Sequence, residues 1–271
     1  MLERQVILES LKPAVREAVE GFEESAGVKV EFRDMPGKAS VKAQTVFDPR
    51  SAMPIVWLAQ EWRDADVAHE VEHMRMQLVD GFGLFAWRSR TTPKDVDAAC
   101  TRILTYVADE VVHERLRKLG LEFAGEIIDS NLWKFYREVT VRLRSGATLR
   151  TDGMTHIDGE GRGKVCRAAY FVQATLLVEG RRPLQPGHVA ATKAFIETFA
   201  QKRKREAKYA GRILELFKAN DVQTISGHDK ILAAWAGMEG ILEHVGVSHY
   251  VKGDDGRYML PWPQDSRETN P

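Results

Sequence analysis

Two histidines four residues apart enclose a glutamate in the segment His69-Glu70-Val71-Glu72-His73. Residues four apart share one face of an α-helix, so both imidazoles can bind the same metal ion. Glu70 would then face a water molecule held by that ion. The pattern His-Glu-x-x-His arises by chance in about one chain in fifty of this composition. The helices and strands around the motif must therefore be considered before a hydrolytic role is assigned to it.

A small sheet is expected before this motif. Apolar residues alternate with polar ones, or cluster densely, in three short segments: 28–32, 45–47 and 54–58. An amphipathic helix over 5–22, which Gly27 would end, is expected to precede them. The motif therefore follows strands along the chain.

Two helices are expected to carry the candidate ligands. Asp64 and Asp66 offer capping oxygen atoms at the start of the first helix, and Gly81 would close it. The second helix begins at Thr92-Pro93, a capping residue followed by a proline in the first turn, and ends at Gly120. The histidines thus lie on one helix, and the next helix is available to supply a further ligand.

A third protein ligand is needed, because a catalytic zinc ion takes three such ligands and keeps one position for water. His69 and His73 supply two. The helix some forty residues downstream offers Asp109, Glu110 and His113. A boundary error of one residue rotates a helical position by about 100°, so these three residues stay alternatives on spacing alone.

The order of strand, motif helix, loop and acid-bearing helix resembles the zincin metallopeptidases, most closely the gluzincins, over about residues 50 to 120. The resemblance implies that Glu110 is the third zinc ligand. It also implies that Glu114, four residues later, holds the other ring nitrogen of His69. The alternative is that Glu110 and Glu114 form an exposed acidic stripe paired with Arg117.

The chemistry that this resemblance implies is peptide-bond hydrolysis. Zinc would acidify its bound water and polarise the substrate carbonyl, while Glu70 takes the proton of that water and passes it to the leaving amine. The strand at 54–58 is similar to the zincin edge strand, with which an extended peptide substrate would pair.

The chain departs from the family pattern at two positions in the motif helix. Family members usually carry uncharged or apolar residues where this chain has Glu72 and Arg75. Glu72 would point away from the metal, so that side of the helix is expected to be solvated. Three residues are candidates for the group that stabilises the oxyanion, by residue type alone: Tyr106, His113 and His156.

Composition favours an ordinary globular protein. The chain has 271 residues, of which 44% are hydrophobic, and its 39 basic and 39 acidic residues cancel. The overall charge therefore gives no preference for nucleic acid, membranes or acidic substrates. Two cysteines, the absence of a secretory pattern at Met1 and the lack of a long apolar run predict a cytoplasmic protein without membrane contact.

The predicted fold class is α+β and predominantly helical. We expect three parts: a zincin-like domain at 1–122, a helical C-terminal region at 123–263 and a disordered tail at 264–271. The C-terminal region would contain one long helix over 188–220, another over 226–245 and a β-hairpin within 247–260. The two helices and hairpin after Gly211 are compatible with a winged-helix-like module, although plain packing is favoured.

The strongest charge run is Lys202-Arg203-Lys204-Arg205, with Lys208 and Arg212 further on. Four consecutive positions on one continuous helix point in every direction, so a solvated surface is favoured over nucleic-acid contact. The leading hypothesis is a zinc-dependent metallopeptidase acting on a peptide or protein. The alternative is a non-enzymatic regulatory protein that binds nucleic acid or a partner and carries the motif incidentally.

Overall fold

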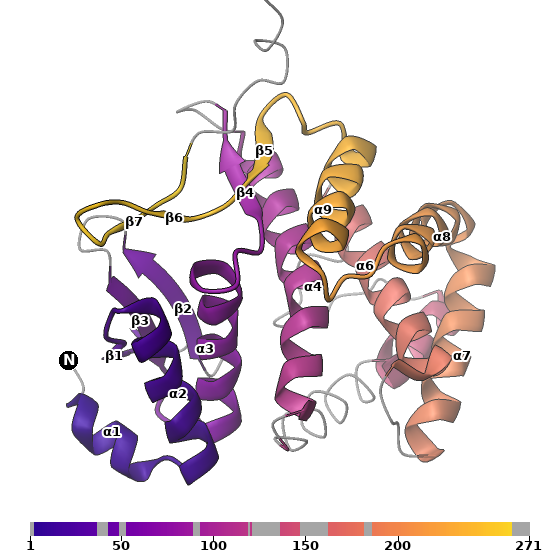
Figure 1. Ribbon diagram of the computed structural model, residues 1–271. Coiled ribbons are helices and arrows are strands. Elements are labelled where there is room, and N and C mark those ends of the chain that lie inside the picture. The colour runs from indigo at the N-terminus through magenta and orange to yellow at the C-terminus, as the bar shows by residue number, and fades with distance from the viewer. Residues whose placement is uncertain are drawn as a thin grey trace, which may run out of the picture.

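The computed structural model describes residues 3–36, 43–48, 53–88, 93–118, 120, 136–146, 162–181 and 186–261 of the chain. Strands and the first three helices gather on one side of the molecule, and the remaining helices form a bundle on the other (Figure 1). The chain is predominantly helical with small sheets, which confirms the predicted α+β class. Within the described ranges, no helix is both long and apolar enough to cross a bilayer.

Two helices open the chain where one was expected. Helix α1 spans Arg4–Ser10 and helix α2 spans Pro13–Ala26, with Leu11 and Lys12 in extended conformation between them. The residue before a proline disfavours the helical region because the proline ring clashes with it, which explains the break. Helix α2 ends at Gly27, whose φ of 68° lies in the left-handed region that favours glycine.

The first sheet has three strands: β1 (Glu31–Asp34), β2 (Ala43–Asp48) and β3 (Met53–Leu58). Their order is β1-β3-β2, with β1 parallel and β2 antiparallel to β3. The prediction that the strand at 54–58 lies at an edge is therefore wrong. Its dense apolar residues fit a central position, since a central strand is buried on more sides. Strands β1 and β2 form the two edges of the described sheet.

Helix α3 (Asp64–Leu78) lies against this sheet, and helix α4 (Lys94–Lys118) lies beside α3 on the side away from the sheet (Figure 1). Helix α3 packs on α2, β2 and β3, and α4 packs on α3, α6 and α9. Asp66 accepts the backbone N–H of Arg63 and closes the first turn of α3. Asp64 instead accepts the N–H of Lys12, which fastens the start of α3 to the start of α2.

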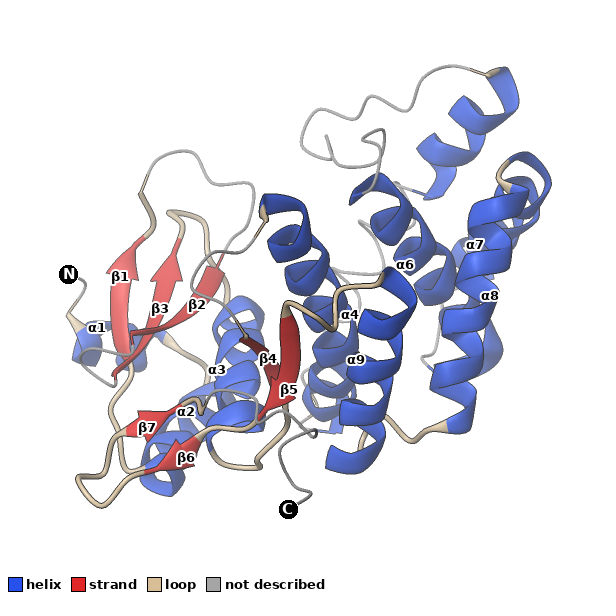
Figure 2. Cartoon of the chain, turned by 90° about the horizontal axis from the view of Figure 1, so that it is seen from above, coloured by secondary structure: helices blue, strands red, loops and turns tan. Residues whose placement is uncertain are grey.

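The C-terminal bundle consists of α6 (Arg162–Leu176), a π-helical turn η1 (Leu177–Arg181), α7 (Pro186–Lys202), α8 (Lys204–Ala219) and α9 (Ile225–Glu239). The prediction of one continuous helix over 188–220 is wrong. Arg203 has φ −126° and ψ 52°, outside the helical region, and separates α7 from α8. Figure 2 shows α6 beside α4, with α7 and α8 beyond α6.

Late strands return to the N-terminal part of the fold. Strand β4 (Leu84–Trp87), which the sequence did not suggest, pairs antiparallel with β5 (Val245–Ser248). The expected hairpin is formed by β6 (Val251–Lys252) and β7 (Tyr258–Met259).

Side chains of that hairpin also join it to the start of the fold. Lys252 Nζ and Tyr258 Oη both donate to the carbonyl of Ala26 at the end of α2. The hairpin thus lies against α2 and not as a wing beside α8 and α9.

One apolar core connects both halves of the chain. It runs from α1 to β7 and includes fully buried side chains of α2, α4 and α9, such as Phe22, Ile103 and Trp235. The predicted boundary at residue 122 and the predicted tail at 264–271 fall outside the described residues. The C-terminal elements therefore help to hold α3 and α4, the two helices that carry the candidate ligands.

Candidate metal centre

Helix α3 turns both motif histidines toward α4. Their Nε2 atoms lie 3.0 Å apart, and their rings meet edge to face with centroids separated by 4.6 Å. The side chains of His69 and His73 are 21% and 17% exposed. The two nitrogens can therefore converge on one ion that solvent still reaches, as the four-residue spacing predicts.

Asp109 of α4 supplies the third atom at this point. Its Oδ1 lies 3.1 Å from His73 Nε2 and 3.5 Å from His69 Nε2. The three donor atoms form a triangle with sides of 3.0, 3.1 and 3.5 Å. One point lies about 1.9 Å from every corner of this triangle, close to the roughly 2.0–2.2 Å at which zinc binds imidazole nitrogen and carboxylate oxygen. The donor set fits a divalent transition-metal ion.

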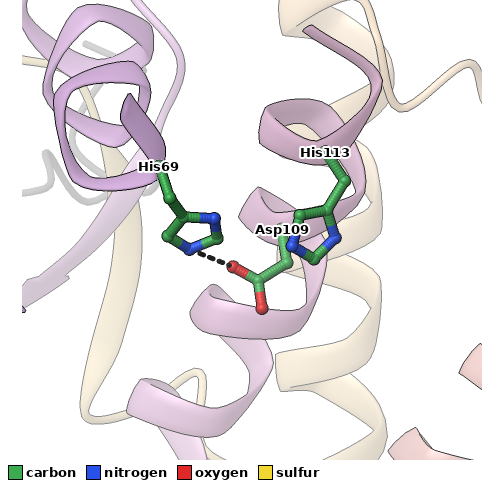
Figure 3. Close-up of side chains that lie close together, drawn as sticks. All are labelled: His69, Asp109 and His113. Atoms are coloured by element: carbon green, nitrogen blue, oxygen red, sulfur yellow. Dashed lines mark ion pairs between the residues drawn. The ribbon is translucent and has the colours of Figure 1, made fainter. Parts of the chain in front are cut away.

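His113 completes the cluster from the next turn of α4. A ligand atom of each of His69, Asp109 and His113 lies within 4.8 Å of the other two. Figure 3 shows His69 facing Asp109 and His113 across the gap between the helices. Asp109 and His113 are four residues apart, as His69 and His73 are, so each helix presents one pair of ligand side chains.

Glu110 does not belong to this group of side chains. It lines a hollow of about 480 Å³ together with Glu114, Arg117 and the 217–223 segment. Its backbone carbonyl accepts a hydrogen bond from Gln223 Nε2. One residue of helix rotates a side chain by about 100°, and that rotation places Asp109 beside the imidazoles. The structure thus favours Asp109, one of the alternatives left open by spacing, over Glu110.

Glu114 also lies away from the histidines. Its carboxylate pairs with Arg117 at 2.6 Å and with Lys118 at 3.7 Å. Among the described residues, no hydrogen-bond partner meets the buried Nδ1 of His69. The hydrogen bond from His69 to Glu114 that the zincin resemblance implied is therefore not formed. Glu114 pairs with Arg117 instead.

Glu70 lies on the sheet side of the cluster. Its backbone carbonyl accepts a hydrogen bond from Thr45 Oγ1 of β2 at 3.2 Å. Its side chain is partly buried, and its negative charge acts on both neighbouring imidazoles. The backbone of the motif glutamate is therefore joined to the edge strand β2, and its charge is felt at both motif imidazoles.

A buried charge cluster sets the contact between α3 and α4. Glu72 is only 3% exposed and pairs with Arg75 at 3.3 Å and with Arg115 of α4 at 3.7 Å. Arg115 also pairs with Asp80 at the end of α3. The expectation that the Glu72 side of the motif helix is solvated is wrong, because α2 and α4 cover it. Arg75 reaches α2 through a hydrogen bond to the carbonyl of Ala18.

The neighbouring groups set the protonation of the candidate ligands. Burial alone would raise the pKa of Asp109, but the hydrogen bond with His73 and the nearby imidazoles of His113 and His69 hold that pKa well below its usual range. Burial and the adjacent His73 lower the pKa of His69. Burial also works to lower the pKa of His73, but Asp109 outweighs it and raises that pKa. At neutral pH the cluster thus offers a carboxylate and at least one neutral imidazole.

The three residues proposed to stabilise the oxyanion do not come together in the structure. His113 lies in the cluster, whereas Tyr106 packs edge to face on Tyr170 with ring centroids 6.0 Å apart. His156 falls outside the described residues. His113 is therefore the only one of the three that the described structure brings to the site.

Comparison with family models, with curated proteins and with solved structures found no match for this chain.

Proposed function

We propose that this protein is a metal-dependent hydrolase, with zinc as the ion and peptide bonds as the substrate. The observation that carries the proposal is the convergence of His69 Nε2, His73 Nε2 and Asp109 Oδ1 on one point. The same motif holds Glu70, a carboxylate of the type that serves as a general base. Three ligands with partial solvent exposure match the donor count of a catalytic zinc site.

His69, His73 and Asp109 would hold the ion. Bound zinc supplies Lewis-acid chemistry, polarising a carbonyl oxygen and lowering the pKa of water to about 7. Asp109 is ionised at neutral pH, because its pKa is held low despite burial, so it contributes a full negative charge. The lowered pKa of His69 keeps the lone pair of that imidazole available.

Glu70 would accept a proton from the attacking water and deliver it to the leaving amine. Its position next to His69 in the motif places it beside the ligand cluster, and Thr45 of β2 fixes its backbone. Glu72, two residues on, is occupied by Arg75 and Arg115 on another side of the helix. Because the carboxylate of Glu72 is taken up by two arginines, we assign the proton-transfer role to Glu70.

Strand β2 would bind the substrate. It is paired with β3 on one side only in the described part of the sheet, and it runs beside α3. Val46 of this strand is 41% exposed, and Thr45 contacts the backbone of Glu70. An extended peptide can add to such an edge through main-chain hydrogen bonds, which would bring its backbone carbonyls to the ligand cluster. We assign this role to β2 because β3 is central and, of the two edge strands, β2 is the one that packs on α3.

The deciding experiment uses the full chain and two matched carboxamide substitutions. We expect wild type, Glu70→Gln and Glu114→Gln each to bind about one zinc ion per chain. Glu70→Gln should lower the hydrolysis of a mixed peptide library by about 100-fold or more, while Glu114→Gln retains it. Absence of zinc binding, or hydrolysis that Glu70→Gln leaves unchanged, would reject the proposal.

A structural metal site is the second candidate, and His113 is the observation that favours it. If His113 joins His69, His73 and Asp109, four protein ligands close the coordination shell and leave no position for water. The visible spectrum of the cobalt-substituted protein distinguishes the two cases. A spectrum that changes in His113→Ala and is insensitive to added azide indicates a closed site, whereas azide sensitivity in wild type indicates an open one.

A further inference from the structure

The basic run at 202–205 does not lie on one helix. Lys202 ends α7, Arg203 has non-helical dihedral angles, and Lys204 begins α8. The view that its side chains scatter around a continuous helix is therefore wrong. The direction of each basic side chain must be considered on the helix to which it belongs.

Helix α8 carries its basic residues on one exposed face. Lys204, Lys208 and Arg212 are each four residues apart and all exposed, and Arg205 is exposed beside them. Residues four apart lie about 6 Å apart along a helix axis. The opposite face of α8 is buried in the core through these side chains: Tyr209, Ala210, Ile213, Leu214 and Phe217. We define the exposed face of Lys204, Arg205, Lys208 and Arg212 as the α8 basic face.

One acidic residue, Glu215, is exposed on the same side of α8, three residues after Arg212, but within the described structure it forms no ion pair with this face. Basic residues elsewhere, including Arg4, Arg75 and Arg115, form ion pairs, but no described ion pair involves a member of the α8 basic face. Lys204 and Arg205 also occupy the first turn of α8, where the helix dipole is positive and acidic residues are favoured. In a chain of zero net charge, the positive charge is concentrated locally at a cost in stability.

We infer that the α8 basic face binds the phosphate backbone of a nucleic-acid duplex, without sequence preference. A line of cations at regular spacing matches a polymer of regularly spaced phosphates. A bilayer surface would call for apolar side chains next to the cations, and none of the exposed large hydrophobic residues of the described chain lies on α8. Single strands would call for exposed aromatic residues, on which bases stack. A duplex backbone, by contrast, can be bound through charged contacts to its phosphates without apolar or aromatic side chains.

The magnitude follows from counterion release. The four cations of this face would neutralise about four phosphates, which gives a slope of about −3.6 for log K against log salt concentration. Each contact is then worth about 8-fold in affinity at 0.1 M salt. Replacing three of the cations should lower affinity by about 500-fold and reduce the slope by about 3.

The test measures fluorescence anisotropy of a labelled 30-base-pair DNA duplex of random sequence with the full chain, at 50 to 200 mM salt. The test variant is Lys204→Gln/Lys208→Gln/Arg212→Gln. The control, Lys94→Gln/Lys193→Gln/Lys230→Gln, removes the same charge from exposed positions on α4, α7 and α9. We expect the test variant to lose affinity and slope as calculated, and the control to keep both within about 3-fold.

Charge-conserving substitution guards against a folding defect. The variant Lys204→Arg/Lys208→Arg should bind the duplex as wild type does, and circular dichroism should show that no variant melts at a lower temperature than wild type. Wild type that does not bind at 50 mM salt, or equal losses in test and control variants, would overturn the inference. Equal affinity for polyaspartate and for the duplex would do so as well, since it would reassign the face to an acidic protein.

Discussion

The choice between Asp109 and Glu110 gives the sharpest prediction about the ligand cluster. Asp109 Oδ1 lies 3.1 and 3.5 Å from the two imidazole nitrogens, whereas the Glu110 side chain lines a hollow with Glu114 and Arg117. The substitutions Asp109→Asn and Glu110→Gln both replace one carboxylate oxygen by an amide nitrogen at adjacent positions. Their difference therefore reports which carboxylate binds the metal.

The structure sets the expected size of this difference. Asp109→Asn replaces an anionic donor by a neutral amide and so removes the only negative charge among the three donor groups, and the loss should reach at least the upper end of the roughly 10- to 100-fold that follows loss of a ligand's hydrogen-bond partner. We expect at least about 100-fold weaker zinc binding, which corresponds to about 2.7 kcal/mol. Glu110→Gln should change zinc affinity by less than about 3-fold.

Zinc affinity is measured at pH 8 by competition with a chromophoric chelator, and thermal unfolding supplies a second readout. Zinc at 100 times the wild-type dissociation constant should stabilise wild type and Glu110→Gln by about 2.7 kcal/mol. The same concentration should stabilise Asp109→Asn by about 0.4 kcal/mol or less. The reasoning is refuted if Glu110→Gln loses zinc while Asp109→Asn retains it, or if neither substitution changes affinity.

Four further predictions concern stability. Burial would raise the pKa of Glu23, but hydrogen bonds from Arg4, the Val30 N–H and Lys29 outweigh it and lower that pKa. The stabilisation that ionised Glu23 gives to the fold is therefore complete above the pKa that Glu23 has in the unfolded chain, about 4.3. It is lost as the pH falls through the lower pKa that Glu23 has in the folded protein. Glu23→Gln should cost about 2 kcal/mol in urea unfolding at pH 7, and a cost that persists at pH 2 would contradict this. Burial raises the pKa of Glu72, although the charges of Arg75 and Arg115 oppose it. The free energy of unfolding therefore falls as the pH rises past the pKa that Glu72 has in the unfolded chain. Glu72→Gln keeps the side-chain volume and removes a charge that burial disfavours, so its free energy of unfolding at pH 7 should match that of wild type within about 1 kcal/mol, and a loss of several kcal/mol in urea titration would disprove it. Gly211→Ala should stabilise α8 by about 0.5–1 kcal/mol, because a Cβ there meets no atom within 4 Å. Gly227→Ala should cost about 1–3 kcal/mol in the same titration, because its Cβ would lie 1.9 Å from the Asp221 carbonyl oxygen.

Local patterns predicted most helices well. Pro93 and Gly120 bracket α4, and Gly27 ends α2 in a left-handed conformation, because these residues restrict the backbone by themselves. Two breaks were missed for different reasons. The break before Pro13 has a local cause in the proline, whereas the break at Arg203 has no signal in residue type. Strand β4 was missed because its partner β5 lies about 160 residues away.

The sequence by itself determined that His69 and His73 share a helix face with Glu70 between them, since four-residue spacing is a local property of the α-helix. It also offered Asp109, Glu110 and His113 as further ligands without ranking them by geometry. Only the tertiary structure decided among these, because the rotation of α4 against α3 depends on packing and on the partly buried ion pairs of Arg115 with Glu72 and Asp80. A rotation of about 100° separates Asp109 from Glu110, and contacts distant in sequence fix it.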